Sequence, residues 1–515
     1  MVPQGPTPSN VPLPQSTELT CGRASARASV QIAAALRTLL AHDVGEWDRH
    51  GFVRTKERTV RSVLAGELGD VPVHIKVFRA DTLADRTRDR LRGPQGEREA
   101  ANLVRAAAMG LPTVEPLACG TAVDGELLRS FLVTRTVASG RPFTFSAATR
   151  AQRRAGALLR RMHDHGWLPG DLHPGNLLVD AHDEPWLLDL TSVQHAGEPG
   201  VRRRAAALAF FCHDLDAGAL DPAAHELLAA YVTAGAGPSM ALDPALHREL
   251  RLATKRWRAR ALPAFGRRCT RNCRHTEVPP RRRGLPRWHW HLDGGGDQAT
   301  LRARCAALAD APGVPDKTGR RGSVWLLPDL VVKERDAGTA RRLWQSSYWL
   351  LFARVAAAPP IALRLHGGRG LVFAARVAEQ SLGAELAAGR LDARAVERAA
   401  ASLGRNVARL HAHGLGNRDL KLDNLVRDPD SGEVCMVDLD GISRGSATDT
   451  RGRGRDLGRL LAAFRAAGEP GGAMTMRTFL RHYLRASRRL LHEPELQRVL
   501  LRAQQRAGQW ASAHA

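Results

Sequence analysis

The chain has 515 residues, more than a single hydrophobic core normally organises, so its length predicts more than one domain. Its hydrophobic content of 43% and charged content of 25% are those of a globular protein and exclude a fibrous or wholly disordered chain. The formal net charge of +24 favours anionic partners, namely an acidic membrane surface, phosphorylated molecules or nucleic acid. The alternative is that a GC-rich genome raised the Arg, Ala and Gly content together.

The N-terminal stretch and the cysteines bear on where the protein resides. The chain begins MVPQGPTPSNVPLPQ, which is rich in Pro and lacks the charged and apolar regions of a signal peptide, so we expect residues 1–20 to form a disordered tail. No apolar run approaches the roughly 20 residues that span a bilayer. The 7 cysteines are unevenly spaced and predict no disulfide framework, which is typical of a reducing cytoplasm. We therefore expect a cytoplasmic protein.

Residues 21–276 carry a succession of strand and helix patterns that predicts a first α+β domain. The alternating stretch VPVHIKVFRA predicts a strand that contains Lys76. GEREAANLVRAAAMG predicts the following helix, LVTRTV a further strand, and a second helix ends with RRMHDHG. The segment HDHGWLPGDLHPGNLLVD then holds Asp171 and, five residues later, Asn176, and a short apolar stretch leads to Asp189.

A basic stretch rich in Pro, Arg and Gly, EVPPRRRGLPRWHWHLDGGGDQ, follows this domain. It shows no evident period, and its Pro and Gly clusters predict a linker at residues 277–298. We expect Trp288 and Trp290 to pack the linker onto a domain surface, with stacking on a sugar ring as the alternative. The nearby CTRNCRH hints at a metal site, but it has no second pair at zinc-finger spacing, and we expect a basic surface loop instead.

Residues 299–515 repeat the order of the first domain. DLVVKERD predicts a strand with Lys333, TARRLWQSSYWLLFARVAAA a helix, LVFAARV a strand, and VARLHAHG the end of a second helix. HAHGLGNRDLKLDNLVRD again places an Asp, Asp419, five residues before an Asn, Asn424, and Asp438 follows a short apolar stretch. A period of about 250 residues indicates a duplicated domain and not a solenoid.

These groups are the ones that phosphoryl transfer from ATP requires: a cation on the phosphates, side chains that hold Mg²⁺, and a base near the acceptor hydroxyl. On HGWLPGDLHPGNLLVD with WLLDLTS, and on HGLGNRDLKLDNLV with CMVDLDG, both halves resemble the protein-kinase-like fold, and specifically the Kdo/WaaP (InaA-type) lipopolysaccharide kinases. The resemblance covers roughly residues 45–275 and 315–465. It implies two tandem two-lobed domains, each with a small β-rich lobe and a helical lobe, that use ATP and Mg²⁺.

The resemblance also implies a role for each residue of the pattern. The implied sites are Asp171 and Asp419 as catalytic bases, Asn176, Asp189, Asn424 and Asp438 as ligands of Mg²⁺, and Lys76, Glu99, Lys333 and Lys421 as residues that bind or position ATP. Glu99 is the expected ion-pair partner of Lys76, because Glu99, Leu103 and Ala107 recur on one helical face. Glu97 is the fallback.

Both halves depart from the family pattern. The second has no acidic residue between Asp336 and Ile361, so no helix carboxylate is available to Lys333, and we expect the first half to carry most of the catalysis. Neither half shows a clear glycine-rich phosphate loop. His173 stands where the second half has Lys421, and His at that point is more typical of small-molecule and sugar kinases.

Four further polar residues are expected to support the loops. His163 and His411 stand at helix ends, where we expect buried, hydrogen-bonded scaffold histidines and not catalytic ones. Asp456, in GRDLGRLL, is expected to orient the second catalytic loop from a following helix, and Asp214 is the candidate counterpart in the first half.

The function expected from the sequence is that of an ATP-dependent kinase acting on a sugar hydroxyl of the lipopolysaccharide core or a related glycolipid. Its expected partners are ATP and an anionic glycolipid or sugar acceptor, with peripheral contact to the acidic inner face of the cytoplasmic membrane. One alternative is a nucleotide-binding pseudokinase or regulatory protein, and another is a protein Ser/Thr/Tyr kinase. Nucleic acid is not an expected partner, because no recognition motif accompanies the charge.

Overall fold

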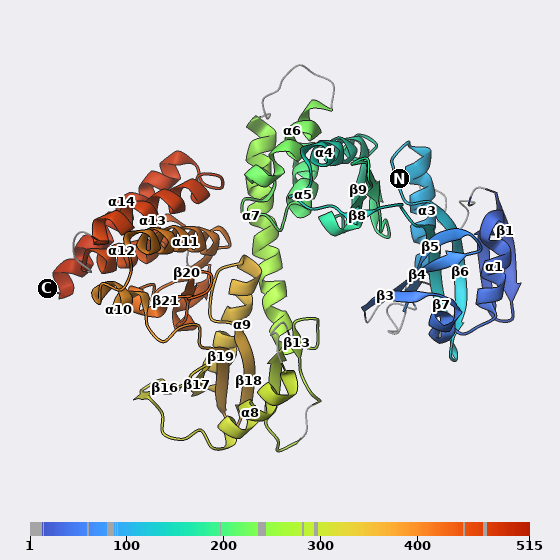
Figure 1. The fold of residues 1–515 in the computed structure, drawn as a ribbon. Helices are drawn as coiled ribbons and strands as arrows, with labels where there is room; N and C mark the ends of the chain where they lie inside the picture. The colour runs from blue at the N-terminus through green and yellow to red at the C-terminus, as the bar shows by residue number, and fades with distance from the viewer. Residues whose placement is uncertain are drawn as a thin grey trace. The chain divides into compact units, whose positions relative to one another are not determined.

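The computed structural model describes residues 13, 15–58, 61–79, 87, 89, 91–195, 197–234, 244–280, 283–292, 297–445, 449–466 and 471–514. The chain divides into two compact units, Met1–Thr254 and Lys255–Ala515 (Figure 1). Each unit contains one seven-stranded sheet together with helices, so the predicted mixture of helix and sheet is confirmed. In the described part of the chain, no helix is both long enough and apolar enough to cross a membrane.

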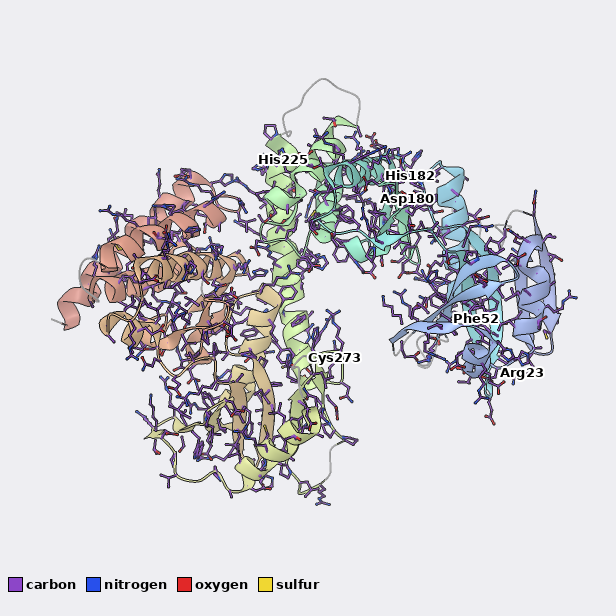
Figure 2. The ribbon with its side chains drawn as sticks, viewed as in Figure 1. Arg23, Phe52, Asp180, His182, His225 and Cys273 are labelled. Atoms are coloured by element: carbon purple, nitrogen blue, oxygen red, sulfur yellow. The ribbon has the colours of Figure 1, made fainter. Side chains whose placement is uncertain are left out.

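The first unit begins with an antiparallel sheet of order β1-β2-β6-β7-β5-β4-β3. Its strands are β1 (Ser16–Cys21), β2 (Ala24–Ser29), β3 (Val53–Arg58), β4 (Arg61–Leu68), β5 (Val71–Phe78), β6 (Pro116–Asp124) and β7 (Leu127–Arg135). Side chains alternate between two apolar layers: Val77 packs in the layer with Leu36 of α1 (Val30–Leu40), and Phe78 in the layer with Leu103 of α3 (Gln95–Ala108). The short helix η2 (Val44–His50) closes the α1 side and leads to the buried Phe52, labelled in Figure 2.

The rest of the first unit is mainly helical. Its elements are β8 (Arg141–Pro142), α4 (Thr149–Asp164), β9 (Trp167–Pro169), η3 (Pro174–Asn176), β10 (Leu177–Val179), β11 (Pro185–Leu187), β12 (Val193–His195), α5 (Val201–Phe211), η4 (Gly218–Leu220), η5 (Pro222–Ala224), α6 (His225–Thr233) and the start of α7 (Pro244–Gly266). The hairpin of β10 and β11 turns at Asp180, whose carboxylate accepts from the backbone N–H of His182 at 2.8 Å (Figure 2). This tight turn fixes the register of the strand that leads to Asp189.

The second unit repeats this order around a sheet β13-β14-β18-β19-β17-β16-β15. Its strands are β13 (Thr276–Glu277), β14 (Arg287–His291), β15 (Lys317–Gly319), β16 (Gly322–Leu326), β17 (Leu330–Asp336), β18 (Pro360–His366) and β19 (Arg369–Ala375). The helices η6 (Arg267–Thr270), α8 (Gln298–Asp310) and α9 (Ala337–Ala353) accompany it. The lysine strands match: Lys76 of β5 faces Leu132 of β7, and Lys333 of β17 faces Val372 of β19.

The second unit also ends in a helical region. Its elements are α10 (Leu382–Ala387), α11 (Ala393–Ala412), β20 (Leu415–Asn417), η7 (Leu422–Asn424), β21 (Leu425–Arg427), β22 (Val434–Met436), η8 (Leu439–Gly441), β23 (Ile442–Arg444), α12 (Thr450–Ala466), α13 (Gly471–Ser487) and α14 (Glu493–His514). An apolar core joins α9, α11 and α12 to the short strands. The loop from β20 to β21 carries Asp419 and Asn424, as the loop from β9 to β10 carries Asp171 and Asn176.

The region expected to be a linker differs from the prediction. Residues 287–291 form β14, which pairs with β18 of the second sheet, and the division between the units falls earlier, between Thr254 and Lys255. Trp288 and Trp290 stack with their ring centroids 4.5 Å apart and join the cluster around Phe373. The sequence RWHWH alternates as a strand does, but the Pro and Gly residues on both sides obscured this short period.

The cysteines form no disulfide in the structure. All seven are free thiols. Among the described residues, no group of three or more His, Cys, Asp and Glu side chains is placed to hold a metal ion. The motif CTRNCRH instead lies at η6 and the turn after it, where the Cys269 carbonyl accepts a hydrogen bond from Trp344 Nε1 at 2.9 Å. This stretch therefore combines a short helix around the buried Cys269 with a turn that exposes Arg271 and Arg274.

Candidate active site

The central ion pair of the first unit joins Lys76 of β5 to Glu99 of α3. Lys76 Nζ lies 2.5 Å from Glu99 Oε1, and the Glu99 side chain is fully buried. Helix α3 reaches this depth because Gly96 lies against β7, where an added Cβ would meet the Phe131 carbonyl oxygen at 2.2 Å. The Gly96 N–H also donates to Ser130 Oγ at 2.9 Å. A glycine at this one position therefore lets the helix bring its carboxylate to the lysine.

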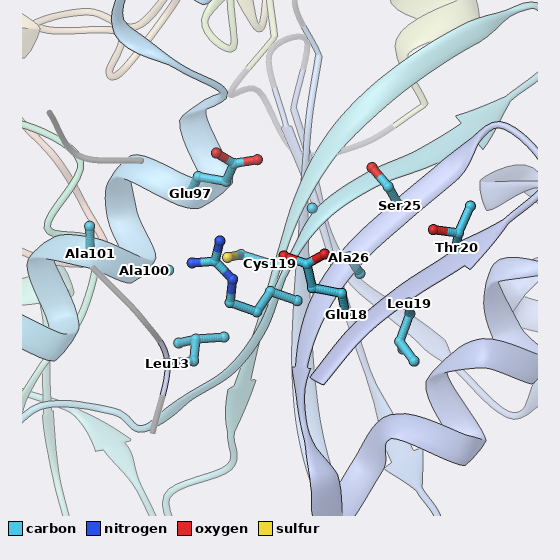
Figure 3. Close-up of a pocket in the computed structure, with 12 residues that line it drawn as sticks. Leu13, Glu18, Leu19, Thr20, Ser25, Ala26, Glu97, Ala100, Ala101 and Cys119 are labelled. Atoms are coloured by element: carbon cyan, nitrogen blue, oxygen red, sulfur yellow. The ribbon is translucent and has the colours of Figure 1, made fainter. Parts of the chain in front are cut away.

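Glu97, the fallback partner, lies elsewhere. It lines a separate pocket of about 230 Å³ together with Arg27 and Cys119 (Figure 3). Burial raises the pKa of Glu97, partly offset by the charge of Arg27. Burial likewise raises the pKa of Glu99, and the charge of Lys76 opposes it. The pairing expected from the helical face, Glu99 with Lys76, is the one present, and Glu97 does not take part.

Asp189 is the second carboxylate near Lys76. Burial acts to raise its pKa, but the charges of Lys76 and Arg61 outweigh burial and hold the pKa below its usual value, so the group is ionised at neutral pH. Arg61 Nη1 forms an ion pair with Asp189 Oδ2, and Thr191 Oγ1 donates to Oδ1 at 3.3 Å. The backbone of Asp189 has a φ of +56°, a left-handed conformation that is uncommon outside glycine and is found often at functional sites.

The loop with Asp171 is fixed by its backbone. Asn176 Nδ2 donates to the Asp171 carbonyl at 2.8 Å, and the Asn176 carbonyl accepts from Leu188 N–H at 2.9 Å. Gly170 N–H donates to the Ser192 carbonyl at 2.8 Å, so hydrogen bonds attach the loop on either side of the Asp189 segment. The Asp171 side chain is exposed. The arrangement presents a solvent-accessible carboxylate on a rigid loop beside a buried one.

His173 occupies the middle of that loop. Its Nδ1 accepts from the Gly175 N–H at 3.1 Å and caps η3. Burial lowers the pKa of His173, and the negative charge of Asp171 opposes this shift. A neutral imidazole with Nδ1 as acceptor carries its proton on Nε2. His173 therefore stabilises the turn between Asp171 and Asn176.

In the second unit the lysine contacts the later Asp directly. Lys333 Nζ lies 3.1 Å from Asp438 Oδ1. Burial acts to raise the pKa of Asp438, but the charge and hydrogen bond of Lys333 outweigh it and the pKa is lowered. Helix α9 contains no Asp or Glu, so it offers no carboxylate to Lys333. A neighbouring pair, Arg335 with Asp440 at 3.2 Å, is almost buried.

The loop of the second unit that carries Asp419 is more enclosed than the loop that carries Asp171. Arg459 of α12 pairs with Asp419 Oδ1 at 2.9 Å, and Asn424 Nδ2 donates to Asp419 Oδ2 at 2.9 Å. Lys421, expected to bind nucleotide, has its Nζ 3.8 Å from Asp423 Oδ2, an exposed carboxylate of the same turn. The structure therefore gathers Lys333 and Asp438, and separately Asp419 and Asn424, and it pairs Lys421 with neither set.

Asp456 orients the second loop as expected. Its Oδ2 accepts from Asn417 N–H at 2.8 Å and lies 3.5 Å from His411 Nε2. Asp214, the candidate counterpart, does not lie on the equivalent helix, because α5 ends at Phe211, although its charge acts on His173 of the first loop. Asp456 stands 18 residues after Asp438, and the residue 18 after Asp189 is Ala207. The first unit has thus no carboxylate at this position of its helix.

The two helix-end histidines are buried scaffold residues, as expected. His163 Nδ1 lies 2.8 Å from the Tyr231 hydroxyl, and His411 Nδ1 lies 2.9 Å from the Tyr483 hydroxyl. Burial, together with the charge of Arg204, lowers the pKa of His163 to about 4. Burial also lowers the pKa of His411, which Asp456 opposes. His163 thus joins α4 to α6, and His411 joins α11 to α13.

Comparison with known proteins bears on the first unit. Residues 52–213 match the model of the lipopolysaccharide kinase (Kdo/WaaP) family, so the resemblance seen in the sequence is confirmed for this segment. The segment is under a third of the chain, and it contains Lys76, Glu99, Asp171, Asn176 and Asp189. No curated protein matches the chain. The likeness described for residues 315–465 stays a prediction.

Two solved structures share some similarity with the chain. One is described as the bifunctional kinase-methyltransferase WbdD at medium resolution, with 16% identity over 38% of this chain and 47% of that one, and a TM-score of 0.25. The other is a high-resolution WbdD structure, with 16% identity over 39% of this chain and 50% of that one, and a TM-score of 0.27. The chain therefore spans half or less of the length of these proteins, and similarity at this level does not bear on its function.

Proposed function

We propose that the first unit is an ATP-dependent phosphotransferase that acts on a sugar hydroxyl of the lipopolysaccharide core or a related glycolipid. The observation that carries the proposal is the buried Lys76–Glu99 pair beside the ionised Asp189. A lysine held by a carboxylate gives a fixed cation, and a second carboxylate close to it suits a metal that bridges phosphates. The family match over residues 52–213 supports the acceptor class.

The residues present fit a magnesium ion. Asp189 supplies an ionised carboxylate, and Asn176 has its amide nitrogen engaged with the Asp171 carbonyl, which leaves its amide oxygen as a ligand. Mg²⁺ prefers oxygen ligands and is often held by one or two protein groups, with phosphates and water completing its coordination. When bound, the metal would neutralise the charge that develops on the phosphate oxygens. Lys76, held by Glu99, would supply a cation to the phosphates.

Asp171 has the exposure that a base for a large acceptor requires. Its carboxylate would take the proton of the acceptor hydroxyl as that oxygen bonds to the terminal phosphorus and the bond from phosphorus to the ADP oxygen breaks. The loop holds Asp171 through its carbonyl, so the carboxylate remains available to a substrate. Preorganised positioning of this kind is the main contribution that phosphoryl transfer asks of a protein.

For the second unit we propose nucleotide binding with weak or regulatory catalysis. Lys333 contacts Asp438 and has no carboxylate on α9 to hold it, so binding a metal at Asp438 would leave the lysine without a fixed position. Asp419 has both oxygens engaged. These contacts favour the nucleotide-binding alternative for this unit. The opposing observation is its sequence NRDLKLDN, which resembles the protein-kinase loop more closely than the first unit does.

The charge of the chain agrees with an anionic acceptor. A formal net charge of +24 would attract a phosphorylated glycolipid and would favour peripheral association with the acidic inner face of the cytoplasmic membrane. Both effects weaken as salt screens the charges. The protein is therefore proposed to work at that surface from the cytoplasm.

The proposal is tested with γ-labelled ATP and the purified full-length protein. Core oligosaccharide is offered as one acceptor and a generic unfolded protein as another, each with and without Mg²⁺. We expect label on the oligosaccharide only when Mg²⁺ is present, and its loss in Asp171→Asn. Transfer to the protein acceptor alone would establish the protein-kinase alternative, and nucleotide binding without any transfer would establish the regulatory one.

A further inference from the structure

Arg61 occupies a position from which it faces the proposed nucleotide site. It is the first residue of β4, where this strand pairs with Arg58 of β3. Side chains alternate along β4, so Arg61 and Val63 share one face while Ser62 and Leu64 are buried on the other. Val63 is the cross-strand partner of Lys76, and directly opposed residues project to the same face. Arg61 and Lys76 therefore lie on the same side of the sheet.

The contact that Arg61 makes crosses 128 positions of sequence. Its guanidinium pairs with Asp189 Oδ2, the carboxylate proposed to hold Mg²⁺. The two side chains are only 18% and 8% exposed. Since Thr191 donates to the other oxygen, a metal at Asp189 would require Arg61 to give up its position on Oδ2. Leaving a guanidinium group this buried without an anionic partner would strongly destabilise the folded protein.

The local charges indicate what the new partner would be. Arg61 and Lys76 supply two positive charges, and Glu99 and Asp189 supply two negative ones, so the site is balanced as it stands. Pairing Asp189 with a divalent cation leaves the Arg61 charge in excess. The planar fork of guanidinium donors matches two oxygens of a phosphate group better than a lysine ammonium does.

We propose that Arg61 binds the terminal phosphates of the nucleotide, exchanging Asp189 for them when the nucleotide enters. Residues 53–63, VRTKERTVRSV, contain no glycine, so this hairpin lacks the residues with which a glycine-rich loop brings its backbone amides to phosphates. Arg61 supplies a charged side-chain contact in their place. The inference rests on the proposed function of the first unit. It adds Arg61 to the residues that the sequence assigns to ATP and Mg²⁺, which are Lys76, Glu99, Asp171, Asn176 and Asp189.

The second unit shows what the site becomes without this arginine. Its strand β16 pairs Val324 with Lys333, as β4 pairs Val63 with Lys76, so the position that matches Arg61 is Gly322. A Cβ at Gly322 would meet the Glu334 carbonyl oxygen at 2.1 Å, which leaves no room for a side chain. The lysine itself then pairs with the metal-site aspartate. The equivalent carboxylates of the two units thus have different partners, Arg61 for Asp189 and Lys333 for Asp438.

The test is nucleotide affinity measured by isothermal titration calorimetry. All proteins carry Lys333→Ala and Asp438→Ala, so that the first unit dominates the signal, and ATP, ADP and AMP are titrated in excess MgCl₂. We expect Arg61→Ala to weaken ATP binding by about 10- to 100-fold, the loss typical of a charged hydrogen bond, and to change AMP binding less than about twofold. Arg61→Lys should recover part of the ATP affinity.

Arg129→Ala is the matched control. Arg129 is another sheet arginine of the first unit that pairs with a carboxylate, Asp124 at 2.9 Å, and it lies on β7 outside the ATP pattern. The Arg129→Ala substitution should leave the affinities for ATP and AMP unchanged. Unchanged or tighter ATP binding in Arg61→Ala would overturn the inference, since Arg61 would then only block Asp189. Equal losses for ATP and AMP would overturn it as well, by showing a structural role. Absence of any adenine nucleotide binding in the Arg129→Ala protein and its parent would instead refute the proposed function itself.

Discussion

Arg459 holds Asp419 in the second unit, with 2.9 Å between Nη2 and Oδ1. Asn424 donates to the other carboxylate oxygen at 2.9 Å. No hydrogen bond or ion pair to the carboxylate of Asp171, its equivalent in the first unit, is found among the described residues. A base whose oxygens are already engaged has fewer positions at which to take a substrate proton. The two loops therefore share a sequence pattern but differ in whether the carboxylate of their aspartate is already hydrogen-bonded.

The first prediction concerns this difference. Asp171→Asn should abolish most phosphoryl transfer to the acceptor, whereas Asp419→Asn should reduce it by less than about twofold, because the free carboxylate is in the first unit. Both proteins should still bind Mg-ATP, since neither residue is a proposed metal ligand. Initial rates with labelled ATP on the same acceptor decide it. Activity that survives Asp171→Asn and disappears in Asp419→Asn would assign catalysis to the second unit.

The second prediction separates the two glutamates of α3. Glu99→Gln removes the charge that holds Lys76, and the phosphates lose a fixed cation, so the rate should fall by about 100-fold. Glu97→Gln is the control on the same helix, and its rate should stay within about twofold because Glu97 lines another pocket. The ratio kcat/KM for ATP measures both. Similar losses of kcat/KM in the two variants would show that activity depends on the intact helix α3 and not on the Lys76–Glu99 ion pair.

The third prediction concerns the support of the second loop. Asp456→Ala removes a fully buried carboxylate that binds Asn417 N–H and His411, and should destabilise this unit by about 3 kcal/mol. Asp214→Ala, a half-exposed residue, should change stability by no more than about 0.5 kcal/mol.

Hydrogen exchange suits this measurement because two units need not unfold together. Amides of residues 411–424 should lose protection in Asp456→Ala, and those of residues 163–176 should keep it. Equal loss in both segments would mean that the two units unfold as one.

The fourth prediction follows from the buried histidine of the first unit. The pKa of His163 is lowered to about 4 by burial, whereas an unfolded histidine titrates near 6.5. The unfolded state therefore binds the proton more tightly, and stability is lost as pH falls from about 6.5 to about 4, by up to about 1.4 kcal/mol per pH unit. Above about 6.5 this group contributes no pH dependence.

His163→Gln tests that assignment by difference. The variant should be less stable at pH 7, because it loses the contact with Tyr231 at 2.8 Å. Its unfolding free energy in urea should, however, fall less steeply between pH 6.5 and 5 than that of the parent protein. Parallel slopes would show that His163 is protonated without cost in the folded state.

The sequence predicted the parts of the site that depend on local pattern. Helical periodicity separates Glu99 from Glu97 by placing Glu99 with Leu103, and both lie on the buried face of α3, although Ala107 of the predicted face is exposed. The motif GRDLGRLL predicts Asp456 on a helix that follows the second loop, and α12 contains it. Asp214 does not occupy the position of Asp456, because the same interval of 18 residues after Asp189 leads to Ala207.

Other features required three-dimensional information. Arg61 looks like any charged residue of a hairpin, and its role depends on the register of β4 and on a segment that returns 128 positions later. The engagement of Asp419 by Arg459 depends on how α12 packs against its loop. Neither contact leaves a periodic signal, because each joins elements that fold separately along the chain.

Strand β14 sets a limit on how the chain can be cut into fragments. A fragment that starts at residue 299, after the expected linker, would lack β13 and β14, so β18 would keep its pairing with β19 but lose the partner strand on its other edge. Such an open edge, next to the apolar surface around Phe373, invites pairing between molecules and aggregation. A fragment that retains the chain from Lys255 keeps both strands, so an isolated second unit should remain monodisperse only when residues 276–291 are included.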